Sequence, residues 1–141
     1  MADAVVLDTS ACFAFLEDEA GADVVESYLV EAKQGGRVIH LSFATLTEVE
    51  YITTQERGAS DAEAALAKMK AWPIRWLHSD GALCGEAAKL KAAHKVSFAD
   101  AFVAATAQRF GAMLVHKDPD FDALTGIIKL HPLPPKPGKT T

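Results

Sequence analysis

The feature that most constrains this chain is the alternation of short apolar segments with longer segments of helical pattern. Five segments read as strands, at residues 4–7 (AVVL), 37–41 (RVIHL), 73–77 (PIRWL), 112–115 (AMLV) and 127–130 (IIKL). They are apolar almost throughout instead of alternating with polar residues, which predicts strands buried on both faces. Strands separated by helices favour an α/β fold of three layers, α/β/α, whose central five-stranded sheet is mostly parallel.

The segments between these strands carry helix start and stop signals. The predicted helices cover residues 10–18, 21–33, 45–57, a segment that starts at residue 60, and residues 80–94 and 97–110. Ser60 and Glu63 have the spacing of a capping box, and Gly111 is placed to end the last helix. Two helices are therefore predicted between the first and second strands, between the second and third, and between the third and fourth.

The bulk composition fits one domain with a substantial core, because 50% of the 141 residues are hydrophobic. We expect this domain at residues 1–131, followed by a Pro-rich extended tail at residues 132–141. No apolar run approaches the ~18 residues of a membrane-spanning helix, and the N-terminus has no signal-peptide pattern. These features predict a cytoplasmic protein without membrane association, in which Cys12 and Cys84 are reduced core thiols.

The formal net charge of −5 argues mildly against broad nucleic-acid binding, since contacts to phosphate need Lys and Arg. Net charge is a blunt measure, however. A clustered acidic site would produce the same excess and could be neutralised locally by a metal ion.

Four acidic residues from distant segments are predicted to share one rim of the sheet. Asp8 ends the first strand and Asp118 follows the fourth, while Glu48 and Asp100 lie near the starts of helices. In open parallel sheets, ligands bind beyond the carboxyl ends of the strands, where the strand order reverses. If the first and fourth strands are neighbours at that point, both of their carboxylates face one crevice.

Each of these acids also has a purely structural interpretation. Asp8 can cap the helix that follows it, and the acids at 118–122 can belong to a solvated turn. Glu48 and Asp100 each follow a Thr or Ser by three residues, the spacing of a capping box. As a set on one rim, however, the acids suit Mg²⁺ or Mn²⁺, which prefer carboxylate and water oxygens. Metal ions held in this way can support phosphodiester hydrolysis.

Four segments of the chain together resemble the signature segments of PIN-domain nucleases. They are VVLDTSA (5–11), TLTEVEY (45–51), SFADAFVAATA (97–107) and LVHKDPDF (114–121), in the family's order. The small size and compact loops are similar to those of VapC-type toxins of toxin–antitoxin pairs. The resemblance spans residues 4 to about 130, and its strength lies in the ordered set, because a lone LDTSA is a weak signal.

The resemblance implies a role for particular residues. Asp8, Glu48, Asp100 and Asp118 match the family's catalytic quartet, and Asp8, Asp100 and Asp118 would hold the metal ion. Asp120 matches a further acid, and Thr9 matches a hydroxyl residue that often follows the first Asp. His116 departs from the pattern, because the family commonly has Thr there. That exchange would alter either how the last loop is held or how RNA is contacted.

The resemblance also implies an activity and partners. The implied activity is a Mg²⁺- or Mn²⁺-dependent endoribonuclease that cleaves RNA, and the implied partners are a VapB-like antitoxin and a second copy of the chain. The nearly all-apolar helical segment at residues 11–16 (ACFAFL) needs cover from the core or from another chain. RNA-contact candidates are Lys117 and His116, with further basic residues at Arg75, Lys68, Lys70, Lys89, Lys91 and Lys95.

Two alternatives without nuclease activity remain open from the residues alone. A receiver-like signalling domain would use acids after the first strand and a late lysine, for which Lys117 is suitably placed. It would also need a phosphoacceptor after the third strand, and Asp80 lies well beyond that strand. A degenerate PIN-like domain that only binds a partner is the other alternative, and the complete acid set argues against it.

Overall fold

The computed structural model describes residues 3–135, and the remainder of the predicted tail, residues 136–141, lies outside the described residues. The strands are β1 (Asp3–Leu7), β2 (Arg37–Ser42), β3 (Arg75–Leu77), β4 (Met113–His116) and β5 (Leu130–Pro132). The helices are α1 (Thr9–Leu16), α2 (Ala22–Lys33), α3 (Phe43–Arg57), α4 (Ala59–Lys70), α5 (Gly81–Ala93) and α6 (Phe98–Phe110), with a 3₁₀ helix η1 (Pro119–Leu124).

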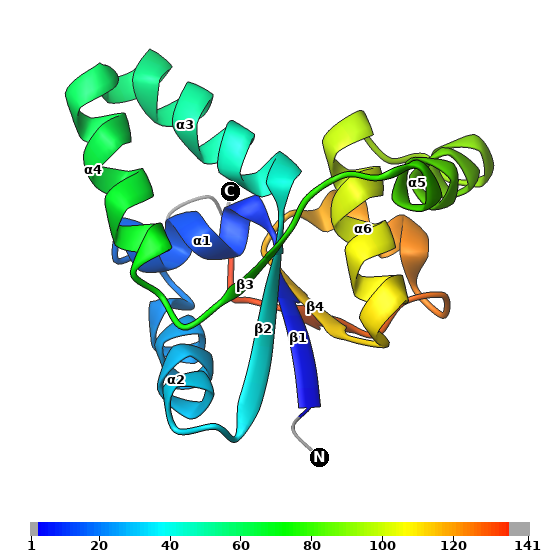
Figure 1. The fold of residues 1–141 in the computed structure, drawn as a ribbon, viewed down its shortest axis with the longest axis horizontal. Coiled ribbons are helices and arrows are strands. Elements are labelled where there is room, and N and C mark those ends of the chain that lie inside the picture. Colours follow the sequence, from blue (N-terminus) through cyan, green and yellow to red (C-terminus); the bar gives the residue numbers. More distant parts are fainter. Residues whose placement is uncertain (1–2, 136–141) are drawn as a thin grey trace.

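All five strands form one sheet in the order β3-β2-β1-β4-β5, and every pair is parallel. This confirms the predicted α/β class and goes further than the expected mostly parallel sheet. The chain runs outward from β1 through β2 to β3 and then returns to β4 and β5 on the other side of β1 (Figure 1). The strand order therefore reverses between β1 and β4, and the carboxyl ends of these two strands flank one crevice.

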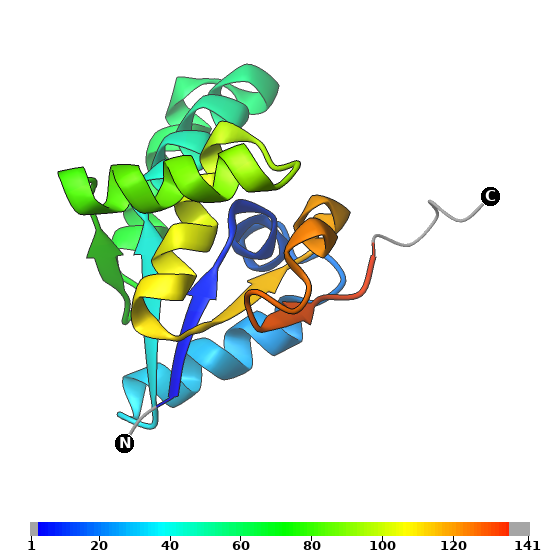
Figure 2. The same ribbon diagram turned by 90° about the vertical axis from the view of Figure 1, so that its right-hand side faces the viewer.

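Helices cover both faces of the sheet, and each face has its own core. Val5 and Leu7 of β1 pack with α1, α2 and residues of β2, while Val6 between them packs with α5 and α6. Figure 1 shows α1, α2 and α4 on one side of the strands and α5 and α6 on the other. Figure 2 shows β4, η1 and β5 on the side of β1 that faces away from β2 and β3. Burial on both faces explains why the strands are apolar throughout.

The fifth strand begins three residues later than the expected 127–130 and ends two residues later. Ile128 is buried in the core from a loop whose Gly126 has φ 87°, and β5 instead pairs Leu130 with Leu114 and Pro132 with His116. A proline is tolerated there because β5 is an edge strand. Leu133 is also buried and its N–H donates to the His116 carbonyl, so the packed chain extends beyond the expected boundary at residue 131.

Two expected helix starts differ from the structure. α4 begins at Ala59, and its N-cap Gly58 makes no side-chain cap bond, so the capping box at Ser60 and Glu63 is wrong. α3 begins at Phe43 because Ser42 ends β2 in an extended conformation and accepts the Ala44 N–H at 3.1 Å. The earlier start places Glu48 in the second turn of α3.

The cysteines and the helix lengths of the described chain can also be compared with the predictions. Cys12 is buried, as predicted, whereas Cys84 is exposed on α5, so the expectation of two core thiols is wrong for Cys84. Within residues 3–135, no helix has both the length and the apolar character that crossing a membrane requires.

Candidate metal centre

Asp8 lies directly after β1 and is 3% exposed. Its Oδ1 accepts the Ala11 N–H at 2.7 Å, which makes it the N-cap of α1 as the structural interpretation predicted. The Ser10 hydroxyl donates to both carboxylate oxygens, at 2.8 and 2.7 Å. Burial raises the pKa of Asp8 to about 7; these hydrogen bonds oppose the rise, and the charges of Asp100 and Asp118 add to it.

Asp100 lies in the first turn of α6, and its N–H donates to the Ser97 hydroxyl at 3.1 Å. The predicted cap is therefore present, and the carboxyl group faces the same crevice. Partial burial, followed by the charges of Asp118 and Glu48, raises the pKa of Asp100 to about 6. A cap does not explain this shift, because the hydrogen bond to Ser97 lowers the pKa of Asp100, whereas burial and the neighbouring carboxylates raise it.

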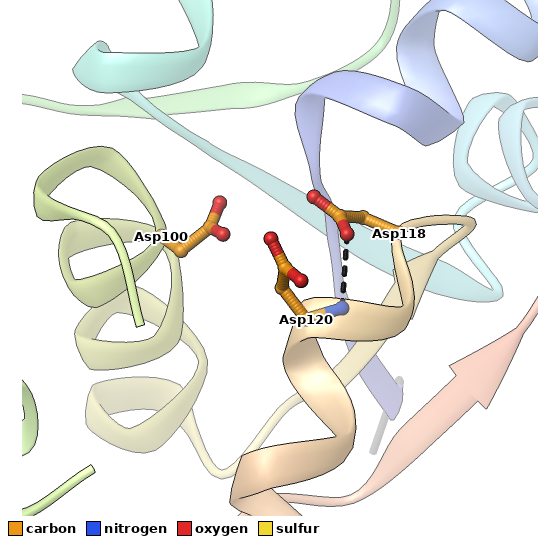
Figure 3. A group of neighbouring side chains, drawn as sticks. All are labelled: Asp100, Asp118 and Asp120. Carbon is orange, nitrogen blue, oxygen red and sulfur yellow. Dashed lines mark hydrogen bonds between the residues drawn. The ribbon is translucent and has the colours of Figure 1, made fainter. Parts of the chain in front are cut away.

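Asp118 and Asp120 come from the loop after β4. The Asp118 side chain accepts the Asp120 N–H at 2.9 Å and caps η1, so the two carboxylates are held on one turn of chain. One oxygen from each of Asp100, Asp118 and Asp120 lies within 4.8 Å of the others. Figure 3 shows the three side chains pointing toward one another, Asp100 from α6 and the other two from the start of η1.

Glu48 and Thr9 join the same rim from α3 and α1. Thr9 donates its hydroxyl hydrogen to Glu48 Oε1 at 2.5 Å, across 39 residues of sequence. Because Glu48 lies in the second turn of α3, it is not a capping acid. Its charge contributes to the raised pKa of Asp100, which places it close to the aspartates.

This donor set fits a hard divalent cation. Three carboxylates converge and two more lie beside them, and burial together with neighbouring negative charge raises the pKa values of Asp8 and Asp100. Carboxylate oxygens suit Mg²⁺ and Mn²⁺. The structure groups Asp120 with Asp100 and Asp118, whereas the sequence placed Asp8 in that set and Asp120 as an addition.

Comparison with known proteins decides the family. The family model of the PIN domain matches residues 5–127. The chain belongs to the PIN-domain family. No curated protein sequence matches the chain.

Solved structures with the fold of this PIN domain include VapC toxins and their complexes. VapBC2 from Rickettsia felis, bound to a promoter DNA fragment, has a TM-score of 0.73 at 17% identity and covers 93% of this chain and 99% of its own. DNA-bound VapBC from Salmonella typhimurium has a TM-score of 0.72 at 19% identity, and the match covers 94% of this chain and 98% of the other. Mycobacterium tuberculosis VapC20, a sarcin–ricin loop cleaving toxin, has a TM-score of 0.69 at 22% identity, and the match covers 86% of this chain and 95% of the other. At these identities the likeness shows the fold alone.

The two leading RNA-contact candidates of this PIN domain are buried. His116 is 2% exposed, and its Nδ1 lies 2.9 Å from the Asp118 carbonyl oxygen, so the imidazole holds the loop that carries Asp118. Burial lowers the pKa of His116. The Lys117 side chain is 7% exposed and its ammonium pairs with Glu19 at 3.6 Å. Both side chains make contacts within the protein, and their contact with RNA stays a prediction.

The remaining basic candidates are exposed, at Arg75 on β3, Lys68 and Lys70 on α4, Lys89 and Lys91 on α5, and Lys95 after it. Their contact with RNA stays a prediction. Sequence reasoning missed Ser10, although the hydroxyl two residues after Asp8 in the stretch DTS is a signal for a side chain that bonds to the capping acid.

Proposed function

We propose that this PIN domain is a metal-dependent endoribonuclease that hydrolyses RNA phosphodiester bonds and is the toxin of a type II toxin–antitoxin pair. The observation that carries the proposal is the convergence of Asp100, Asp118 and Asp120 beside Asp8 and Glu48. Acids held this close together repel one another, and a divalent ion would offset that cost. Action on cellular RNA is expected in the cytoplasm.

In this proposal Asp100, Asp118 and Asp120 hold Mg²⁺ or Mn²⁺, with Asp8 as a further ligand. The ion supplies a polarised water and stabilisation for the leaving oxygen. The chain contributes rigidity, because Asp8 is fixed by two hydrogen-bond donors and Asp118 by the start of η1. Thr9 orients Glu48 beside these acids, where its carboxylate could accept a proton from a water molecule.

A VapB-like antitoxin is the proposed partner, supported by the VapBC complexes among the structural neighbours. The surface that suits it is a groove of about 240 Å³ between α1, α3 and α4, lined by Phe13, Leu16, Thr53 and Ala64 among others. The apolar segment at residues 11–16 is thus only partly covered by the chain's own core. A homodimer remains a prediction from the family resemblance.

The proposed activity is tested by cleavage mapping on total cellular RNA with Mg²⁺ or Mn²⁺. The parent should give discrete products that EDTA abolishes, and Asp100→Asn or Asp8→Asn should give none. Asp23→Asn is the matched control, because Asp23 is also a first-turn acid but lies exposed on α2. It should cleave like the parent.

The result of this assay distinguishes a nuclease from a degenerate PIN-like domain that only binds a partner. A parent that binds metal and a neighbouring antitoxin but cleaves no RNA would be a degenerate binding module, and the nuclease proposal would be wrong. The receiver-like alternative conflicts with family membership, and the Lys117 ammonium that favoured it is paired with Glu19.

A further inference from the structure

Ser10 is the one hydroxyl among the described residues for which the structure gives bonds to both sides of the crevice. Its hydroxyl hydrogen is shared by the two carboxylate oxygens of Asp8, at 2.8 and 2.7 Å. Its oxygen accepts the Lys117 backbone N–H at 2.9 Å, across 107 residues of sequence. Ser10 thus joins the acid that ends β1 to the residue that immediately precedes Asp118.

This bridge bears on the spacing of the acids. The sheet pairing of β1 with β4 extends to the bond from Asp8 N–H to the Val115 carbonyl at 3.1 Å, and beyond it the two chains separate, one into α1 and the other toward η1. The Ser10 bridge is the next contact along that separation. It therefore fixes where the Asp118 loop begins relative to the Asp8 carboxylate.

We infer that Ser10 is a positioning residue for the divalent ion, which sets the orientation of Asp8 and the separation of Asp8 from Asp118. The inference rests on the proposed function, because it assumes that these acids hold a metal ion. Hydrogen-bond partners of metal ligands orient the ligands, and losing one commonly weakens metal binding. Ser10 itself is not a ligand in this assignment, since its hydroxyl is already used by Asp8 and Lys117.

The neighbourhood of Ser10 indicates which substitutions are informative. Ser10 borders a pocket of about 200 Å³ that Phe13, Ile52 and Lys117 also line. The pocket gives room for the extra methyl group of threonine, so Ser10→Thr keeps the hydroxyl without crowding the core.

The test is Mn²⁺ titration by calorimetry on the full chain without RNA, with thermal melting of each variant in EDTA. Ser10→Ala should raise the Kd for Mn²⁺ roughly 10- to 100-fold, and Ser10→Thr should restore most of the affinity. The matched control is Ser42→Ala, which removes the same atom from a buried serine that caps α3 and whose hydroxyl, among the described residues, accepts the Ala44 N–H. It should lower the melting temperature but leave the Kd unchanged.

The results separate this inference from the proposed function. The positioning role would be wrong if Ser10→Ala binds Mn²⁺ as tightly as the parent, or if Ser10→Thr loses as much affinity as Ser10→Ala. The nuclease proposal would still stand in either case. A parent that binds Mn²⁺ but cleaves no RNA would remove the nuclease proposal and leave the Ser10 result intact. A parent that binds no Mn²⁺ would contradict both.

Discussion

Two carboxyl groups of the rim have pKa values raised well above the ordinary 3.8, Asp8 to about 7 and Asp100 to about 6. In both groups burial is the largest cause, followed for Asp100 by neighbouring negative charge. A folded-state pKa above the unfolded value means that the folded protein binds more protons in the interval between them. The stability of the metal-free protein should therefore fall as pH rises through that interval.

The Asp100→Asn variant should remove part of this pH dependence. In EDTA it should be as stable as the parent or more stable near pH 7, and the advantage should shrink as pH falls toward about 4, where the parent carboxyl is protonated. Chemical unfolding across this range measures the difference. The first-turn control Asp23→Asn should instead lose about 0.3–1 kcal/mol through the helix dipole. Equal losses in both variants near pH 7 would show that Asp100 acts as a cap only.

Lys117 gives a second prediction at this scale, because its burial argues against contact with RNA. Lys117→Met removes the ammonium but keeps the backbone N–H that binds Ser10. Stability should fall, since Glu19 would lose its ion-pair partner in a partly buried site. The KM for RNA should stay at the parent value in steady-state cleavage. A raised KM with an unchanged melting temperature would instead place Lys117 on the RNA.

At the scale of elements, the sequence predicted structure best where a segment carried a single pattern, such as an apolar run typical of a buried strand. The apolar runs at residues 4–7 and 112–115 predicted β1 and β4, and the alternation with helices predicted a mostly parallel sheet. The sequence left open whether these two strands are neighbours, and the structure shows that they pair. The end of the chain was harder. The run at 127–130 has strand-like composition, yet Ile128 is used to fill the core from a loop and pairing begins only at Leu130.

Competing cap signals explain the other differences. Thr45 with Glu48 and Ser60 with Glu63 both have capping-box spacing, but Ser42 and Gly58 precede them and start the helices first. Local spacing does not reveal which cap is used, because that depends on where the preceding strand or helix ends in space. The group of candidate metal ligands was hard to predict for the same reason. Asp120 joins Asp100 and Asp118 only because the chain turns at Asp118, where η1 begins.

The corrected caps predict unequal effects for two similar substitutions. Ser42→Ala should cost about 0.5–2 kcal/mol of stability, because it removes the N-cap of α3. Ser60→Ala should be close to neutral, since Ser60 is exposed and lies inside α4. Denaturant unfolding of the two variants provides the comparison. A larger loss in Ser60→Ala than in Ser42→Ala would restore the capping box that the structure contradicts.

At the scale of the whole molecule, the candidate metal centre and the groove between α1, α3 and α4 share no residues. Ala64 lies exposed in that groove, whereas Ala67 is exposed on the same helix outside it. If the proposed antitoxin binds there, Ala64→Glu should prevent its co-purification with this protein and leave RNA cleavage intact. Ala67→Glu should affect neither. Loss of the complex in both variants, or in neither, would place the antitoxin elsewhere.

The central claim is that the acids after β4 are arranged to hold a catalytic metal ion. The most direct measurement is the Mn²⁺-dependent rate of RNA cleavage by the parent, Asp118→Asn and Asp122→Asn. Asp118 belongs to the converging group, while Asp122 is an exposed acid of the same short segment outside it. We predict that Asp118→Asn abolishes cleavage and that Asp122→Asn cleaves at the parent rate. Equal rates in all three proteins would contradict the account.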